Sequence, residues 1–344
     1  MNKNSDGATN GIDRRQLIRC GLGAGLVAGL GPLGSAPASA QTITMRLGAG
    51  GPITGTQEVA LVKLKEGLES ATQGRIKVTI FPDAQLGGNA ALNNAVKAGT
   101  LDGTITDIPV LSGAVPEVDI FSMPFLFRDT RHALTAAKGS IGAGLRAKIE
   151  QSFACEVLGW GTQGGRDMWN SKHPIHTPDD VRGLKMRVQP SPIQADTYAA
   201  FGALPTPISY SELYTALQTG VIDGADPGPV DLIDSKLYQV TKYLTMTQHY
   251  HIILALIVSK TFVQKLSNQD QEILRDVGKK AADAQADNAL AVESTKLNEL
   301  KGKGIQVFEM ADRNAFVAKV EPVYTKNANR VGGATVIAEA RKIT

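Results

Sequence analysis

Patterns typical of strands and helices alternate along the chain from residue 43 onward, and this alternation limits the possible folds more than any other feature. Residues 76–80 alternate apolar and polar side chains, as a half-buried strand does. Residues 252–258 form a continuous apolar run, as expected of a strand buried on both faces. Residues 61–71 repeat apolar side chains at helical spacing. The alternation predicts an α/β fold with parallel or mixed sheets flanked by helices.

One predicted helix is unusually long. Residues 267–300 contain no proline and a single glycine, Gly278, and they begin with Ser267 and Asp270 as helix-start residues. At about 1.5 Å per residue, this helix would be about 50 Å long, which exceeds the width of a small domain. A chain of 344 residues is long enough for two domains, so we expect this helix to span both. The Gly/Ala-rich segment after residue 327 predicts a frayed C-terminal tail at 331–344.

Residues 1–40 have the pattern of an export signal. Arg14 and Arg15 precede a short apolar segment at 21–33, and Ala38-Ser39-Ala40 forms a small-residue cleavage site. The apolar segment is shorter than the ~20 residues that a membrane anchor requires. The paired arginines and the many glycines favour the twin-arginine route over the general secretory route. We therefore expect the mature chain to begin near residue 41 and to work in the periplasm.

Composition excludes several classes of function. The net charge is +3 and aromatic residues make up 5% of the chain, so a nucleic-acid partner is not expected. The two cysteines, Cys20 and Cys155, are too few for a disulfide framework or a zinc site. His249 and His251 would share one side of a strand, but nothing nearby supplies a third metal ligand. No catalytic or cofactor motif is evident, so we expect no catalytic residue, metal or cofactor. The alternative is that the protein is an exported hydrolase or lyase with an unrecognised site.

Three stretches carry a specific resemblance. They are residues 165–175, which begin with Gly-Arg-Asp-Met-Trp-Asn, residues 183–193, which begin with Gly-Leu-Lys-Met-Arg-Val, and residues 202–226, which end in Asp-Gly-Ala-Asp. Together they closely resemble the periplasmic solute-binding subunit of tripartite ATP-independent (TRAP) transporters, the dicarboxylate-binding (DctP) family. Residues 74–78, 85–87 and 124–127 also match that family, and the resemblance covers residues 43–325.

The resemblance implies a two-lobed periplasmic binding protein fold, whose lobes are linked by hinge strands and the long helix. We expect lobe I at 41–163 plus 252–291 and lobe II at 164–251 plus 292–330. The implied partners are a small organic acid anion and the membrane permease subunits of a TRAP transporter, and we expect a monomer. A subunit of an ATP-driven or sensor-linked system is the alternative within binding proteins.

The resemblance also implies which residues bind the substrate. Arg187, in the Lys-x-Arg-Val strand, matches the family arginine that grips the substrate carboxylate, and Arg166 matches a second family arginine. A guanidinium suits this role because its planar fork of donors matches both carboxylate oxygens. The alternative for each arginine is a surface salt bridge. Gln163 belongs to the same predicted set.

Three further candidates depart from the family pattern. Asp226 stands where relatives often have Asn, Asn89 where they often have Glu, and Trp169 where smaller residues are common. We expect Asp226 and Asn89 to contact the substrate, and Trp169 either to roof the pocket or to fill the core.

The charges of these candidates narrow the ligand. A monocarboxylate cancels one of the two arginine charges, and Asp226 would balance the other if it faced the pocket; a second substrate carboxylate would then be repelled. Ser191-Pro192-Ile193 also resembles the branch of the family that takes sugar acids. We therefore expect a hydroxylated monocarboxylate or sugar acid. The alternative for Asp226 is that it caps the next helix or pairs with a lysine.

Overall fold

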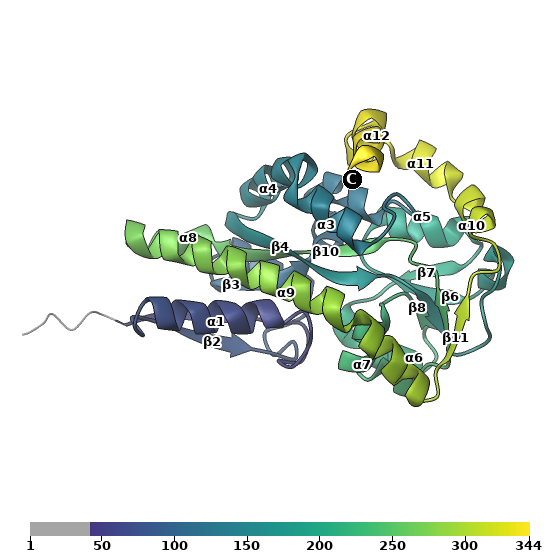
Figure 1. Ribbon diagram of the computed structural model, residues 1–344, viewed down its shortest axis with the longest axis horizontal. Coiled ribbons are helices and arrows are strands. Elements are labelled where there is room, and N and C mark those ends of the chain that lie inside the picture. Colours follow the sequence, from purple (N-terminus) through teal and green to yellow (C-terminus); the bar gives the residue numbers. More distant parts are fainter. Residues whose placement is uncertain (1–41) are drawn as a thin grey trace, which may run out of the picture. The chain divides into compact units, whose positions relative to one another are not determined.

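The computed structural model describes residues 42–344 (Figure 1), so the predicted export signal lies outside the described residues. The first of two sheets has five strands. In spatial order they are β2 (Ile76–Phe81), β1 (Ile43–Gly48), β3 (Gly103–Asp107), β10 (His251–Ser259) and β4 (Cys155–Gly165). β1 is parallel to β2 and β3, whereas β10 is antiparallel to β3 and β4. Every residue of β10 is buried, as its apolar run predicts.

The second sheet has six strands and is also mixed. Its order is β11 (Gln306–Glu309), β9 (Tyr243–Met246), β5 (Met168–Asn170), β8 (Gly224–Ala225), β6 (Lys185–Val188) and β7 (Leu204–Pro207). β6 is parallel to β7 and β8, and β5 is antiparallel to β8 and β9. The two mixed sheets confirm the predicted α/β class. The lobe boundaries proposed from the sequence stay a prediction.

Helices pack around both sheets. Among residues 42–344, no helix is both long and apolar enough to cross a lipid bilayer. The helices are α1 (Val59–Ala71), α2 (Asn89–Lys97), α3 (Thr130–Lys138), α4 (Ser140–Ser152), α5 (Pro192–Ala200), α6 (Leu213–Gln218), α7 (Pro229–Asp234), α8 (Lys260–Val263), α9 (Asn268–Gly302), α10 (Arg313–Lys319), α11 (Glu321–Asn327) and α12 (Ala334–Lys342).

β4 and β10 lie side by side where the chain passes between the two sheets. The chain leaves the first sheet after Gly165 and joins the second at Met168. At this crossing the backbone N–H of Arg166 donates to the carbonyl of Tyr250 at 2.9 Å, and the N–H of His249 donates to the carbonyl of Arg166 at 3.2 Å. Arg166 is therefore held in the paired hinge segment.

The long helix α9 is present as predicted. The Ser267 hydroxyl accepts the N–H of Asp270 at 3.1 Å and caps its first turn. α9 contacts α1 and β4, and its later turns contact α7, so it reaches elements associated with both sheets (Figure 1). A Cβ at Gly159 of β4 would lie 2.6 Å from the Cβ of Ala282, so this glycine permits the close approach of α9 to the sheet.

The prediction of a frayed C-terminal tail was wrong. Residues 334–342 form α12, in which Ile337 and Ala340 are buried. The ring of His132 contacts the carbonyl of Ala340 at 2.9 Å, and the Ser140 hydroxyl donates to Glu339 at 2.6 Å. Two apolar residues three positions apart share one helical face, and that face docks on the region of α3 and α4.

Candidate functional site

Two adjoining cavities lie between elements of the two sheets. One has a volume of about 180 Å³ and is lined by Arg187 and Gln189. The other is narrow, with a volume of about 20 Å³, and is lined by Arg166 and Gln163. Asn89, at the start of α2, lines both cavities, as does Tyr210. Four of the six residues predicted from the sequence therefore come together here.

Arg187 reaches the larger cavity from β6. Its side chain is 2% exposed, and its Nε donates to the carbonyl of Ile208 at 2.9 Å. Within residues 42–344, its Nη1 has no hydrogen-bond partner. Burial lowers the pKa of this guanidinium below its ordinary value. Arg187 is thus not a surface salt bridge but a buried cation with a donor left over at a cavity.

Arg166 has a different environment at equal burial. Its Nη1 lies 2.8 Å from Asp231 Oδ2, and its Nη2 lies 3.5 Å from Asp107 Oδ2. Burial acts to lower its pKa, but the charges of Asp231 and Asp226 outweigh burial and raise the pKa above its ordinary value. Its Nε has no partner in the described part of the chain. Arg166 is therefore largely committed to carboxylates of the protein itself.

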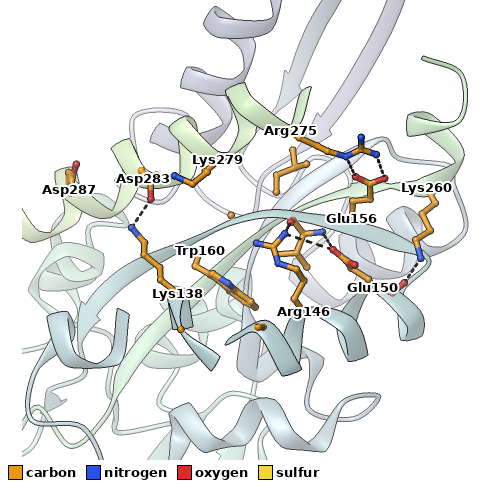
Figure 2. A pocket seen from close by; sticks show the side chains of 15 residues that line it. Lys138, Arg146, Glu150, Glu156, Trp160, Lys260, Arg275, Lys279, Asp283 and Asp287 are labelled. Atoms are coloured by element: carbon orange, nitrogen blue, oxygen red, sulfur yellow. Dashed lines mark hydrogen bonds and ion pairs between the residues drawn. The ribbon is translucent and has the colours of Figure 1, made fainter. Parts of the chain in front are cut away.

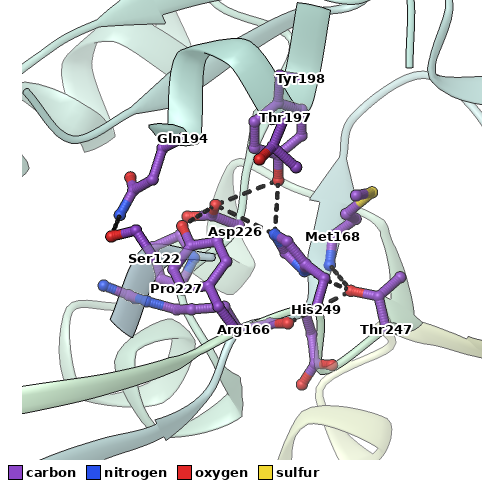
Figure 3. Close-up of polar contacts among 12 residues, drawn as sticks. Ser122, Arg166, Met168, Gln194, Thr197, Tyr198, Asp226, Pro227, Thr247 and His249 are labelled. Atoms are coloured by element: carbon purple, nitrogen blue, oxygen red, sulfur yellow. Dashed lines mark hydrogen bonds and ion pairs between the residues drawn. The ribbon is translucent and has the colours of Figure 1, made fainter. Parts of the chain in front are cut away.

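Asp226 is fully buried near Arg166 (Figure 3). Its Oδ2 accepts from the hydroxyls of Tyr198, at 3.2 Å, and Tyr250, and it lies 3.5 Å from Nε2 of His249. Burial acts to raise its pKa, but the hydrogen bond from His249 and the charge of Arg166 outweigh burial and lower the pKa below its ordinary value. Asp226 lines neither cavity. It is also neither the N-cap of α7, which is Gly228, nor the partner of a lysine among residues 42–344.

Trp169 lies in the core. Its side chain is fully buried in an apolar cluster that includes Leu213 and Leu244, and its indole N–H donates to the carbonyl of Pro227 at 2.9 Å. It lines neither cavity. Of the two roles expected for Trp169, the structure supports core filling and does not bring it to the site.

Four carboxyl groups of the narrow cavity were missed in the sequence. Burial raises the pKa of Glu58 to about 8 and that of Asp231 to about 6. Glu58 accepts the backbone N–H of Gly51 at 3.0 Å, and Asp231 accepts from the Gln163 amide at 2.9 Å. Only Asp107 carried a sequence signal, because it ends a strand at the edge where α/β sheets bind ligands. The missed residues are Glu58, Asp107, Asp231 and Asp234.

A larger hollow lies elsewhere, between α4, β4 and α9 (Figure 2). Its volume is about 1040 Å³. Most of its charged residues pair with one another: Arg275 lies 2.9 Å from Glu156, and Lys138 lies 2.6 Å from Asp283. Neither predicted arginine lines it. Because most of its cations are already paired with carboxylates, this hollow is a poorer candidate for the ligand site.

The two histidines flanking Tyr250 are engaged in hydrogen bonds. The ring of His249 contacts the Thr247 hydroxyl at 2.8 Å, and the ring of His251 contacts the Thr130 hydroxyl at 3.0 Å. Residues 42–344 contain no group of three or more side chains suited to holding a metal ion.

Comparison with known proteins identifies the family. Residues 51–330 match the family of bacterial extracellular solute-binding proteins, family 7 (DctP). The chain belongs to this family. It is 32% identical to the 2,3-diketo-L-gulonate-binding periplasmic protein YiaO of Escherichia coli K12 over 84% of this chain and 88% of that protein. The predicted TRAP-type solute-binding role and periplasmic location are confirmed, and the family is one of binding proteins rather than enzymes.

Solved structures agree on the fold. A TRAP periplasmic solute-binding protein of Polaromonas sp. JS666, bound to D-erythronate, has 35% sequence identity and a TM-score of 0.84, covering 88% of this chain and 99% of that chain. Another from Chromohalobacter salexigens DSM 3043, with bound D-glucuronate, has 26% identity and a TM-score of 0.83, covering 87% of this chain and 100% of that chain. The two-sheet fold with hinge strands and a long helix is that of TRAP solute-binding proteins.

Proposed function

We propose that this protein captures a hydroxylated monocarboxylic acid, such as an aldonate or a uronate, and delivers it to the permease of a TRAP transporter. The single observation that carries the proposal is Arg187. It is a buried guanidinium without a carboxylate partner in residues 42–344, its Nη1 has no hydrogen-bond partner there, and the residue lines the larger cavity. A substrate carboxylate would supply the missing acceptors and charge.

Unpartnered acceptors at the same cavities favour hydroxyl groups on the ligand. Within the described residues, Oδ1 of Asn89, Oδ1 of Asp107 and Oε1 of Gln163 have no hydrogen-bond donor. Buried acceptors without donors are costly, and a polyhydroxylated chain would supply donors to them. Relatives in complex with D-erythronate and D-glucuronate support the same class of ligand.

The protein's own carboxylates disfavour a second carboxylate on the ligand. Arg166 is balanced by Asp231 and Asp107, which flank it, and by the buried charge of Asp226. Arg187 is then the one cation left for the ligand among the residues that line the two described cavities. A dicarboxylate would place its second charge against this acidic lining, where like charges repel.

A binding screen tests the proposal. Thermal shift followed by calorimetry should compare D-erythronate, D-glucuronate and D-galactonate with succinate and malate. A ligand present at 100 times its dissociation constant should stabilise the protein by roughly 2.7 kcal/mol. We expect at least one sugar acid to raise the melting temperature while succinate does not. Tighter binding of succinate than of every sugar acid would refute the proposed ligand class.

A further inference from the structure

The narrow cavity contains more carboxyl groups than cations. Among its lining residues, all within 42–344, Arg166 is the one cation. Lys296 of α9 pairs with Asp234 at 2.8 Å but does not line the cavity. Four carboxyl groups face this space, and we call them the acid cluster: Glu58, Asp107, Asp231 and Asp234.

Two members of the acid cluster share one positive charge. Arg166 lies 2.8 Å from Asp231 and 3.5 Å from Asp107. Burial raises the pKa of Glu58, which is 2% exposed, and the charges that act on this pKa are those of the carboxylates Asp234 and Asp231, which raise it further. One guanidinium cannot neutralise both of its carboxylates, and the neighbours of Glu58 are like charges.

Besides Asn89, two residues that line this cavity carry buried acceptors without a donor within residues 42–344. Asp107 and Gln163 are each 5% exposed, and Oδ1 of the first and Oε1 of the second lack donors in the described chain. With Arg166 included, the charged or titratable groups around the acid cluster are two arginines, one lysine, two tyrosines and one further carboxylate. These groups are Arg166, Arg187, Tyr210, Asp226, Tyr250 and Lys296.

We infer that the acid cluster takes up a proton when the organic acid anion binds, so that the protein captures the anion and a proton together. The inference rests on the proposed function, because the ligand carboxylate at Arg187 is the added negative charge. The ligand carboxylate neutralises Arg187, whose charge otherwise favours the ionised form of Asp107, so Asp107 and Asp231 are left with Arg166 as their shared cation. Two buried carboxylates that share one cation are costly, and protonation of one of them removes that cost. The proton comes from solvent and adds to a carboxylate oxygen of the pair; no covalent bond of the ligand changes.

The direction of the pKa values agrees with this geometry. Burial raises the pKa of Asp231 to about 6 and also raises the pKa of Asp107. A bound anion nearby raises both further. The bound state then holds more protons than the free state, so affinity falls as pH rises through the neutral range, by up to about tenfold per pH unit for one linked proton.

Calorimetry in two buffers measures the proton directly. D-erythronate is titrated into the protein from residue 41 onward, at pH 7, in phosphate and in Tris. The ionisation enthalpies of these two buffers differ. We expect the binding enthalpy to differ between buffers in the direction of proton uptake, by a sizeable fraction of one proton per ligand. Binding with equal enthalpy in both buffers would overturn the inference while leaving the proposed function intact.

Two variants locate the proton. Asp231→Asn should reduce the uptake and flatten the dependence of affinity on pH. Asp283→Asn, which removes a carboxylate that pairs with Lys138 and lines neither of the two site cavities, is the matched control and should leave the uptake unchanged. Unchanged uptake in a folded Asp231→Asn variant, together with unchanged pH dependence, contradicts the assignment to this pair. If that variant does not fold, the two-buffer measurement on the unmodified protein still decides.

A ligand-free measurement covers the case in which no sugar acid binds. The pKa of Glu58 is raised to about 8, so folding holds a proton that the unfolded chain releases above about pH 4.5. The stability that this proton contributes is present below that pH and is lost as pH rises toward 8. Relative to Glu58→Gln, the unmodified protein should therefore lose melting temperature between pH 5 and 8. Parallel curves would show that burial does not hold a proton on the acid cluster at neutral pH, which would contradict the electrostatic premise of the inference.

Discussion

Arg166 and Arg187 are two arginines of nearly equal burial with opposite electrostatic surroundings. Arg166 lies within ion-pair distance of Asp231 and Asp107, and its pKa is raised. Arg187 has no carboxylate at that distance in residues 42–344; it is held by the carbonyl of Ile208, and its pKa is lowered. From the sequence, both arginines are predicted to bind the substrate in one site. The structure separates a residue that organises the site from a residue that remains available to the ligand.

This difference explains how a buried site can be both stable and ready for an anion. A paired arginine is neutralised in the empty protein, and its removal would leave buried carboxylates without a cation. An unpaired buried arginine carries a desolvation cost that a ligand carboxylate relieves. Affinity then comes from relieving that cost, and the strength of binding should follow Arg187 more closely than Arg166.

The largest expected effect concerns the stability contributed by Arg166. Arg166→Ala leaves Asp231 and Asp107 buried without a cation, and we expect the free energy of unfolding to fall by about 3–5 kcal/mol. Urea unfolding without ligand measures the change. Arg275→Ala is the control, because the Arg275–Glu156 pair is largely exposed and should contribute about 0–1 kcal/mol. Equal stability losses in the two variants would mean that Arg166 is not required to neutralise Asp231 and Asp107.

The next effect concerns the affinity contributed by Arg187. Arg187→Ala should weaken binding of a sugar acid by about 2–5 kcal/mol, because the ligand carboxylate would be buried without a partner. Arg187→Lys should also bind poorly, since a point charge does not reproduce the planar fork. Calorimetry measures the affinity of both variants. In urea unfolding without ligand, both variants should be at least as stable as the unmodified protein. Near-native affinity in either variant would rule out Arg187 as the carboxylate contact.

The smallest effect separates the carboxylate contact from the hydroxyl contacts. Asn89→Ala removes one unpartnered acceptor at the boundary of the two cavities, and we expect a loss of about 1 kcal/mol for D-erythronate. Butyrate, which has the same chain length without hydroxyls, should bind weakly and be insensitive to the change. Asn94→Ala, on the exposed face of the same helix, is the control. Equal sensitivity of both acids would mean that Asn89 does not contact ligand hydroxyls.

Much of the fold was predictable because its signals are local. The apolar run of β10 and the uninterrupted helical pattern of α9 depend on spacings of two to four residues, and both elements are present. The helical tail α12 was missed because its two buried residues give a weak pattern beside Gly332 and Gly333. Trp169 carried no local sign of whether it would face a pocket or the core, since both sides of a strand are apolar in a buried sheet.

The sequence by itself determined the family, the mixed α/β architecture with its long helix, and the presence of arginines in the strand and hinge that meet at the site. Only the tertiary structure decided what each charged group pairs with. Asp231 reaches Arg166 across 65 positions of the chain, and Asp226 is occupied by tyrosines at 198 and 250. The reason is physical: secondary structure follows from neighbours a few residues apart, whereas the ionisation and availability of a buried charge depend on which distant segments desolvate it and which partner they place within about 3 Å.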